Sequence, residues 1–308
     1  MRIHAFALLL SLQPFFVHGW DWQQDPKEVG EMINQRCLAK EGEKCAVAQV
    51  VDQEVICGER TTPIRLYVPQ STQQSLSAIL LIHGGAWVGG SLDTHDNLAR
   101  YLCNKASSIV ISVGYLNSPE GKFPLPLKQC YDALLWIQNQ KHIWGIDTER
   151  IAVVGDSAGG NMAAALCLMV RDRKGPPISL QILINPAPDL TGKGSLQPQG
   201  DAWDVMRWQA LCYVNDPIEV YHPYVSPAVA KDLTQLPPAL ILLAEKDFLF
   251  EDGKRYYERL KEAGVASEFY IQDGIGHLGC DGAAATKNAQ ESLDQAVAAL
   301  RAKFWHRE

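Results

Sequence analysis

The spacing of hydrophobic residues changes near residue 78. From there to the C-terminus, short continuous aliphatic runs alternate with longer segments whose apolar residues recur at helical spacing. Continuous apolar runs predict strands buried on both faces, and their alternation with helices predicts a mainly parallel sheet covered on both sides. The predicted strands are 78–82, 109–113, 151–154, 180–184, 239–244 and 268–271, and the predicted helices are 94–105, 126–140, 161–171, 252–263 and 283–304.

Three other regions have different patterns. Residues 20–44 are polar with a predicted helix at 26–38, whose apolar side suggests a cap segment lying over the main domain. Residues 46–56 and 63–68 predict two antiparallel strands, with Pro63 opening the second. Between 189 and 236 the strand–helix alternation lapses into a segment rich in glycine and aromatic residues. Such an insertion between core strands suits a lid over an active site, or its aromatic residues simply pack it onto the core.

The N-terminus has the pattern of a secretory signal. A short basic start is followed by an apolar run over 5–17 and by small residues near position 19. This predicts a signal peptide over 1–19 and an exported protein, periplasmic or secreted. The run is too short for a stable membrane anchor, although an uncleaved hydrophobic helix is the alternative. The predicted organisation is a signal peptide (1–19), a cap segment (20–44) and a catalytic domain (45–308).

Composition narrows the function further. A length of 308 residues with 47% hydrophobic content suits one large domain, and a net charge of −7 without a basic tract gives no indication of nucleic-acid binding. Eight cysteines agree with export. A disulfide is expected among Cys37, Cys45 and Cys57, or between Cys212 and Cys280, whereas helical Cys103, Cys130 and Cys167 are expected to be buried thiols. No spacing of cysteines or histidines predicts a metal site. The oligomeric state is not readable from the sequence.

Candidate chemistry lies at the ends of the predicted strands, where parallel sheets collect their ligands. The strand at 151–154 runs into Gly155-Asp156-Ser157-Ala158-Gly159, and a helix follows. This strand–turn–helix predicts a nucleophile elbow that presents the Ser157 hydroxyl above the sheet. An ordinary glycine-rich turn is the alternative.

The strand at 78–82 leads into a glycine-rich turn over 83–90. Such a turn directs backbone N–H groups at a substrate oxygen, so we expect Gly85 and Ala86, together with Ala158, to form an oxyanion hole. His83 is expected to hydrogen-bond within the turn. Trp87 and Asp156 are predicted to contact the substrate.

A carboxylate and an imidazole follow two later strands. Asp247 comes directly after the strand at 239–244, and His277 lies in a glycine-bordered loop after the last strand. The order Ser157, Asp247, His277 is the one expected of an α/β-hydrolase triad. The neighbouring acidic residues are weaker candidates, and Asp252 is better explained as a helix N-cap. The other histidines, including His95 and His142, lack a strand-end position.

These motifs resemble the hormone-sensitive-lipase-like branch of the α/β-hydrolases, which includes many bacterial esterases. The similarity covers roughly Ser77 to the C-terminus. It rests on 83–87, 90–96, 115–120, 123–124, 155–161, 247–249 and His277. The resemblance implies an α/β-hydrolase fold with an N-terminal cap. It also implies a serine esterase that needs no cofactor and acts on small-molecule esters with short to medium acyl chains.

Three departures from the family pattern concern the pocket rather than the triad. Ala86 stands where the third glycine of the turn is usual, the segment near Tyr115 lacks the usual arginine, and Gly279 replaces the usual phenylalanine. The turn also resembles that of kynurenine-formamidase-like hydrolases, so an amidase or formamidase on the same triad is the second hypothesis. A catalytically silent binding module is the third.

Overall fold

An eight-stranded sheet organises the described chain, which comprises residues 23–305 apart from 41, 58, 194–200 and 278–286 in a computed structural model. The predicted signal peptide, residues 1–19, lies outside the described residues. The strand order is β1-β2-β4-β3-β5-β6-β7-β8; β2 pairs antiparallel with both β1 and β4, and the other pairings are parallel. The strands are β1 (Gln49–Cys57), β2 (Arg60–Val68), β3 (Leu76–Ile82), β4 (Ile109–Val113), β5 (Ile146–Asp156), β6 (Leu180–Ile184), β7 (Ala239–Ala244) and β8 (Ser267–Gln272).

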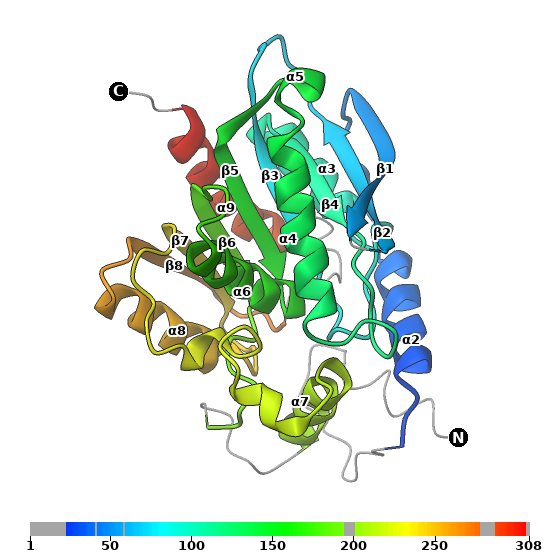
Figure 1. Cartoon of the computed structure of the whole chain (residues 1–308), viewed down its shortest axis with the longest axis vertical. Helices are drawn as coiled ribbons and strands as arrows, with labels where there is room; N and C mark the ends of the chain where they lie inside the picture. Colours follow the sequence, from blue (N-terminus) through cyan, green and yellow to red (C-terminus); the bar gives the residue numbers. More distant parts are fainter. Residues whose placement is uncertain (1–22, 41, 58, 194–200, 278–286, 306–308) are drawn as a thin grey trace.

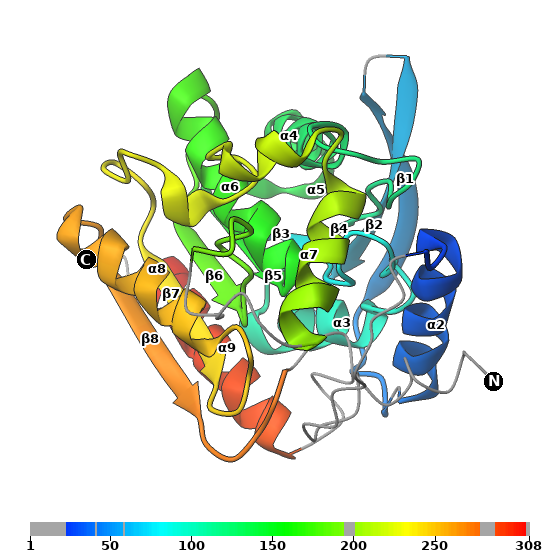
Figure 2. The same cartoon turned by 90° about the horizontal axis from the view of Figure 1, so that it is seen from below.

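Helices cover both faces of this sheet (Figures 1 and 2). Their bounds are α2 (Pro26–Ala39), α3 (Asp96–Ala106), α4 (Leu125–Gln138), α5 (Lys141–Trp144), α6 (Ala158–Arg173), α7 (Asp201–Tyr213), α8 (Phe250–Glu262) and α9 (Lys287–Trp305), with short 3₁₀ turns η1 (Pro217–Tyr221) and η2 (Pro227–Val229). Residues of α4, α6 and α8 form the hydrophobic cluster on one face, and those of α3 and α9 form the cluster on the other. The predicted fold class, a mostly parallel sheet between two helical layers, is confirmed.

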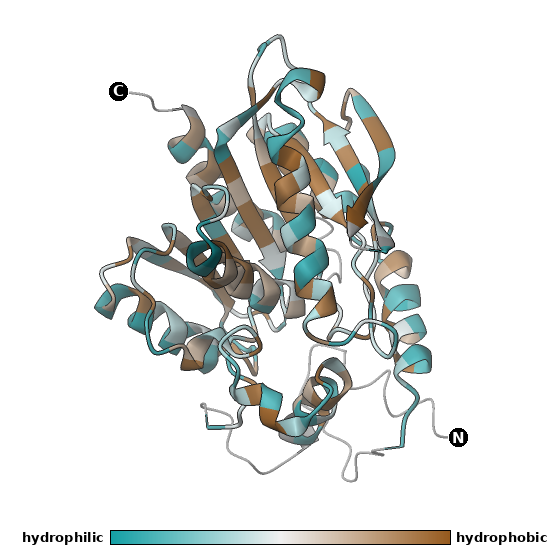
Figure 3. Ribbon diagram, in the orientation of Figure 1, coloured by the Kyte–Doolittle hydropathy of each residue, from teal (hydrophilic) through white to brown (hydrophobic). Residues whose placement is uncertain are grey.

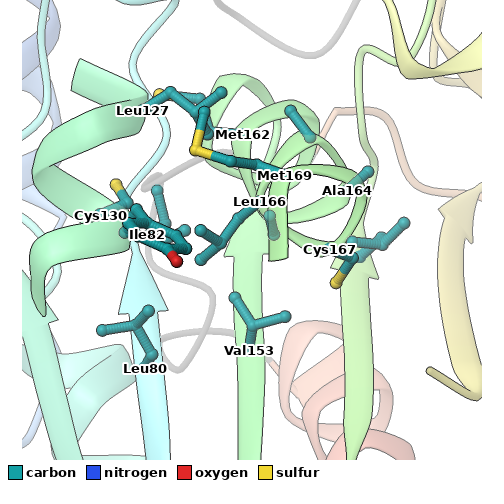
Figure 4. Packing of buried hydrophobic residues seen from close by; sticks show 14 of the residues in the cluster. Leu80, Ile82, Leu127, Cys130, Val153, Met162, Ala164, Leu166, Cys167 and Met169 are labelled. Carbon is teal, nitrogen blue, oxygen red and sulfur yellow. The ribbon is translucent and has the colours of Figure 1, made fainter. Parts of the chain in front are cut away.

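The core follows from the continuous apolar strands. Every residue of β3, β4, β6 and β7 is buried, because alternate side chains face opposite helical layers. Figure 3 shows these strands as hydrophobic bands with polar residues on the outer helices. In Figure 4, Leu80 and Val153 of neighbouring strands point toward the layer that holds Met162 and Leu166 of α6.

The structure corrects one local prediction. Pro63 does not open its strand, because β2 begins at Arg60 and continues through the proline in register with β1. The ladder with β4 begins at Ile64, and just beyond it the Pro63 oxygen accepts a hydrogen bond from Gly114 N at 2.8 Å. A proline has no N–H to donate, so it is tolerated at this position, where the ladder with β4 ends.

Two helices lie beyond the carboxyl ends of the strands. Figure 1 shows α2 (blue) and α7 (yellow-green) past the arrowheads of the parallel strands. They share one apolar cluster with Val88 of the turn that follows β3, and its buried members are Val29, Ile33, Cys37, Val88, Trp208 and Cys212. Among the described residues, no helix has the length and apolar character needed to cross a bilayer.

The structure agrees with some of the cysteine predictions and contradicts others. Cys37 is disulfide-bonded. Cys45 and Cys212 are free thiols, so neither takes part in the expected bridges. Cys103, Cys130 and Cys167 are buried and form no disulfide, as predicted.

Candidate active site

Ser157 occupies a sharp turn between the end of β5 and the start of α6. Its backbone has φ 53° and ψ −118°, a conformation that L-residues rarely adopt. A Cβ on Gly155 would lie 2.3 Å from the Gly159 oxygen, and one on Gly159 would lie 2.1 Å from the Ile82 oxygen. The two glycines of the motif therefore allow strand, turn and helix to approach closely enough to raise Ser157 above the sheet edge.

The structure brings the three predicted triad residues together from separate strand ends. His277 Nε2 lies 2.9 Å from Ser157 Oγ, and His277 Nδ1 lies 2.7 Å from Asp247 Oδ2. The Asp247 side chain is 1% exposed and that of His277 is 23% exposed. The carboxylate accepts the Nδ1–H, which leaves Nε2 free to accept the serine proton.

Hydrogen bonds fix the neighbourhood of Asp247. The backbone N–H of Leu249 donates to Asp247 Oδ1 at 2.9 Å. Glu245, a weaker candidate for the triad acid, accepts from the backbone N–H of Gly274 at 2.7 Å and so ties down the histidine loop. Asp252 is not an N-cap, because α8 begins at Phe250; its carboxylate lies inside the first turn, 3.3 Å from Arg255 Nη2.

The three predicted oxyanion donors lie on the two turns beside Ser157. Ala158 is the first residue of α6, where a backbone N–H has no partner within the helix. Gly85 and Ala86 follow β3, and in the described part of the chain no hydrogen bond uses the N–H of either. Ala86 and Trp87 have φ of 56° and 59°, which turns this backbone away from ordinary strand or helix geometry. These amides are therefore available to a substrate oxygen.

Asp156, which the sequence predicted to contact substrate, lies under the oxyanion turn and is 2% exposed. Its Oδ1 accepts from Gly84 N at 2.9 Å and from His95 Nε2 at 3.0 Å. Burial alone would raise the pKa of this carboxyl, but the charge and hydrogen bond of His95 and the Gly84 N–H hold it below its usual value. Asp156 thus anchors the turn from below.

His83 has the structural role that the sequence predicted. Its Nδ1 donates to the Gly84 oxygen at 2.8 Å, and its ring stacks on that of Tyr115 with centroids 4.0 Å apart. The Tyr115 hydroxyl donates to the His83 oxygen at 2.8 Å. Complete burial and the nearby His95 lower the pKa of His83 to about 3, so the ring is neutral at physiological pH.

Trp87 departs from its prediction. It is 2% exposed and stacks on Tyr213 of α7 with ring centroids 4.9 Å apart, so it supports the turn instead of lining the cleft. The role of His95 was missed, because this residue follows no strand and precedes α3. Its only sequence signal is its place in the Gly90–Asp96 segment that carries part of the family resemblance.

Among the described residues, no group of three or more histidine, cysteine and acidic side chains gathers in a way that could hold a metal ion. The chemistry that this edge supports comes from a hydroxyl, an imidazole, a carboxylate and free backbone N–H groups. Such a set performs nucleophilic acyl transfer, and together with the fold it defines a serine hydrolase.

Comparison with known proteins identifies the family of this chain. Residues 79–280 match the family model described as alpha/beta hydrolase fold, which spans well over half of the chain. The protein belongs to this family, and its predicted place in the hormone-sensitive-lipase-like branch is confirmed.

Several relatives are esterases by name. The chain is 34% identical over 258 residues to an arylesterase of Saccharolobus solfataricus, covering 82% of this chain and 83% of the relative. It is 36% identical over 248 residues to the carboxylesterase NlhH of Mycobacterium tuberculosis, covering 78% and 77%. The structure of EstE1, a thermophilic carboxylesterase from a metagenomic library, superposes with a TM-score of 0.84 at 31% identity over 92% of this chain and 99% of that one.

Proposed function

We propose that this protein is a carboxylic-ester hydrolase that cleaves small-molecule esters with short to medium acyl chains through an acyl-enzyme on Ser157. The observation that carries the proposal is the continuous hydrogen-bonded chain from Asp247 through His277 to the Ser157 hydroxyl. The names of the relatives, arylesterase and carboxylesterase, support an ester as the substrate.

The first half-reaction transfers the acyl group to the enzyme. Ser157 Oγ attacks the acyl carbon while its proton passes to His277 Nε2. The carbonyl oxygen becomes an oxyanion facing the N–H groups of Gly85, Ala86 and Ala158. When the tetrahedral intermediate collapses, the C–O bond to the alcohol breaks and the alcohol takes the proton from His277.

The second half-reaction releases the acid. A water molecule gives a proton to His277 and attacks the same acyl carbon, and the proton returns to Ser157 as the acyl-enzyme breaks. Asp247 holds the imidazole in one tautomer through both steps and stabilises its charged form. One imidazole therefore acts as base and acid in turn.

The test is a panel of p-nitrophenyl esters from acetate to decanoate, assayed with wild type and Ser157→Ala. We expect wild type to release p-nitrophenol fastest from the shorter chains, and Ser157→Ala to lose at least about 10⁴-fold in kcat. A matched p-nitroanilide series distinguishes ester from amide hydrolysis. Equal rates for the two proteins would refute the mechanism, and faster anilide cleavage would favour an amidase.

We also propose that the protein is exported, to the periplasm or the medium. The basic and apolar pattern of residues 1–19 supports this, as does the disulfide of Cys37, since disulfides persist in oxidising compartments. N-terminal sequencing of the protein recovered outside the cytoplasm tests the proposal. A mature chain starting near Trp20 is expected, and an intact Met1 would refute cleavage.

A further inference from the structure

The helix α2 rests directly on the backbone of the oxyanion turn. A Cβ on Gly30 of this helix would lie 2.0 Å from the Val88 oxygen, and one on Gly89 would lie 3.0 Å from the Gly30 oxygen. Val29 and Ile33, on either side of Gly30, pack into the same apolar cluster as Val88. No side chain separates helix and turn at this point, so a displacement of either is transmitted to the other.

One side chain of α2 makes a hydrogen bond to the turn. The backbone N–H of Gly90 donates to Asn34 Oδ1 at 2.7 Å. On the other side of the same residue, Asn117 Nδ2 donates to the Gly90 oxygen at 3.0 Å. Gly90 has φ 84°, a conformation that favours glycine, and two amide side chains from separate elements hold it there.

The Gly90 peptide in turn supports the oxyanion donors. A Cβ on Gly85 would lie 2.2 Å from the Gly89 oxygen and 2.6 Å from Gly90 N, so Gly85 sits on that peptide. The N–H groups of Val88 and Gly89 both donate to the Gly85 oxygen, at 3.1 and 2.8 Å. The Gly89–Gly90 peptide therefore packs directly against Gly85, so a shift of this peptide disturbs the backbone that carries the Gly85 N–H.

The turn needs such support because its backbone is strained. The positive φ values of Ala86 and Trp87 persist only where surrounding contacts impose them. An oxyanion hole acts through donors that are fixed before the charge appears, so a loosened turn stabilises the transition state less while it still admits substrate.

We propose that Asn34 is a positioning residue for ester hydrolysis: its Oδ1 holds Gly90, and through Gly90 the amides of Gly85 and Ala86 are held toward the oxyanion. This inference rests on the proposed function. It gives α2 a part in the rate of the chemical step.

The experiment compares four substitutions on α2 with p-nitrophenyl acetate. Asn34→Leu keeps the volume and removes the acceptor, and we expect kcat to fall about 10- to 100-fold with KM within about twofold, less than deleting a whole donor. Asn34→Ala removes the same acceptor with less steric change and should show the same split. Asn34→Asp keeps an acceptor and should recover kcat to within about threefold. Gln35→Leu, at an exposed position one residue along, should match wild type.

A trifluoromethyl ketone inhibitor separates positioning from a merely structural role. Ser157 Oγ adds to the ketone carbon, its proton passes to His277, and the resulting oxyanion occupies the oxyanion hole. The affinity of the inhibitor should weaken in Asn34→Leu by the same factor as kcat/KM. The unfolding temperature of the protein should change little.

Three results would overturn the inference in an active wild type: unchanged kcat in Asn34→Leu and Asn34→Ala, no recovery in Asn34→Asp, or unchanged inhibitor affinity. A failure of the proposed function itself would give a different assay result. In that case wild type and Ser157→Ala would be equally inactive on every ester, whatever residue 34 is.

Discussion

Two loops at the same edge of the sheet carry groups that the proposed reaction uses, and the two loops are built differently. The turn after β3 is largely buried and is held from below by Asp156 and from above by Asn34. The loop after β8 carries His277 with a side chain 23% exposed, and its residues Asp273 and Gly274 are exposed. Its described attachments to the β7 end include Glu245 and the Lys246 N–H, which donates to the Ile275 oxygen at 2.9 Å.

The chemistry explains the difference. Oxyanion donors stabilise a charge at one place, so any motion of the turn lowers the stabilisation. In the proposed mechanism the imidazole exchanges protons with Ser157, with the leaving alcohol and with water, so it has to reach more than one oxygen. We therefore expect changes in the histidine loop to affect rate more than stability, and changes beneath the turn to affect both.

The largest effect is expected for His277→Ala. Without the base, kcat on p-nitrophenyl acetate should fall about 10⁴-fold or more, because the serine proton has no acceptor. The free energy of unfolding in urea should fall by less than in Asp156→Leu, because the imidazole is partly exposed and water can replace it beside Asp247. His142→Ala, at an exposed position, is the control and should match wild type. If His277→Ala destabilises the protein as much as a change beneath the turn does, the two loops do not differ as proposed.

Asp156→Leu should reduce both stability and rate. It leaves the Gly84 N–H and His95 Nε2 buried without their acceptor, and breaking a buried pair in this way costs about 3–5 kcal/mol of unfolding free energy. Urea denaturation at pH 7 measures this cost. Asp273→Leu, an exposed aspartate in the histidine loop, should change stability by less than about 0.5 kcal/mol. Similar values for the two variants would contradict the contrast between the loops.

The smallest expected effect is a pH dependence of stability that arises from His83 in the turn after β3. The pKa of His83 is about 3 in the folded protein and 6.5 as a free side chain. Between these values the unfolded chain binds a proton that the folded chain does not. The contribution of His83 to stability is therefore complete above pH 6.5 and is lost as the pH falls, by up to about 1.4 kcal/mol per pH unit.

Urea unfolding of wild type and His83→Asn at pH 7, 6, 5 and 4.5 tests this prediction. Asparagine keeps a donor for the Gly84 oxygen but does not titrate, so the variant should lose less stability on acidification. Parallel stability curves for the two proteins would rule out the buried neutral histidine as the source of the slope. The comparison of slopes cancels the other titrating groups that both proteins share.

The sequence by itself determined the fold class and the three residues of the hydrogen-bonded triad. Both depend on local patterns: continuous apolar runs define buried parallel strands, and Ser157, Asp247 and His277 each follow such a run closely. In a parallel sheet the strand ends meet at one edge, so positions 120 and 30 residues apart come within hydrogen-bonding distance. Topology supplies that convergence once the strands are recognised.

Only the tertiary structure decided how the oxyanion turn is supported. His95 and Asp156 are 61 residues apart, and Asn34 and Gly90 are 56 apart, and no periodic pattern connects them. A buried hydrogen bond requires only that a donor and an acceptor meet, and many polar residues satisfy that requirement equally well. For the same reason Asp156 and Trp87, which the sequence assigned to substrate contact, were found to anchor the turn. Their neighbours come from distant elements, and packing determined which groups they met.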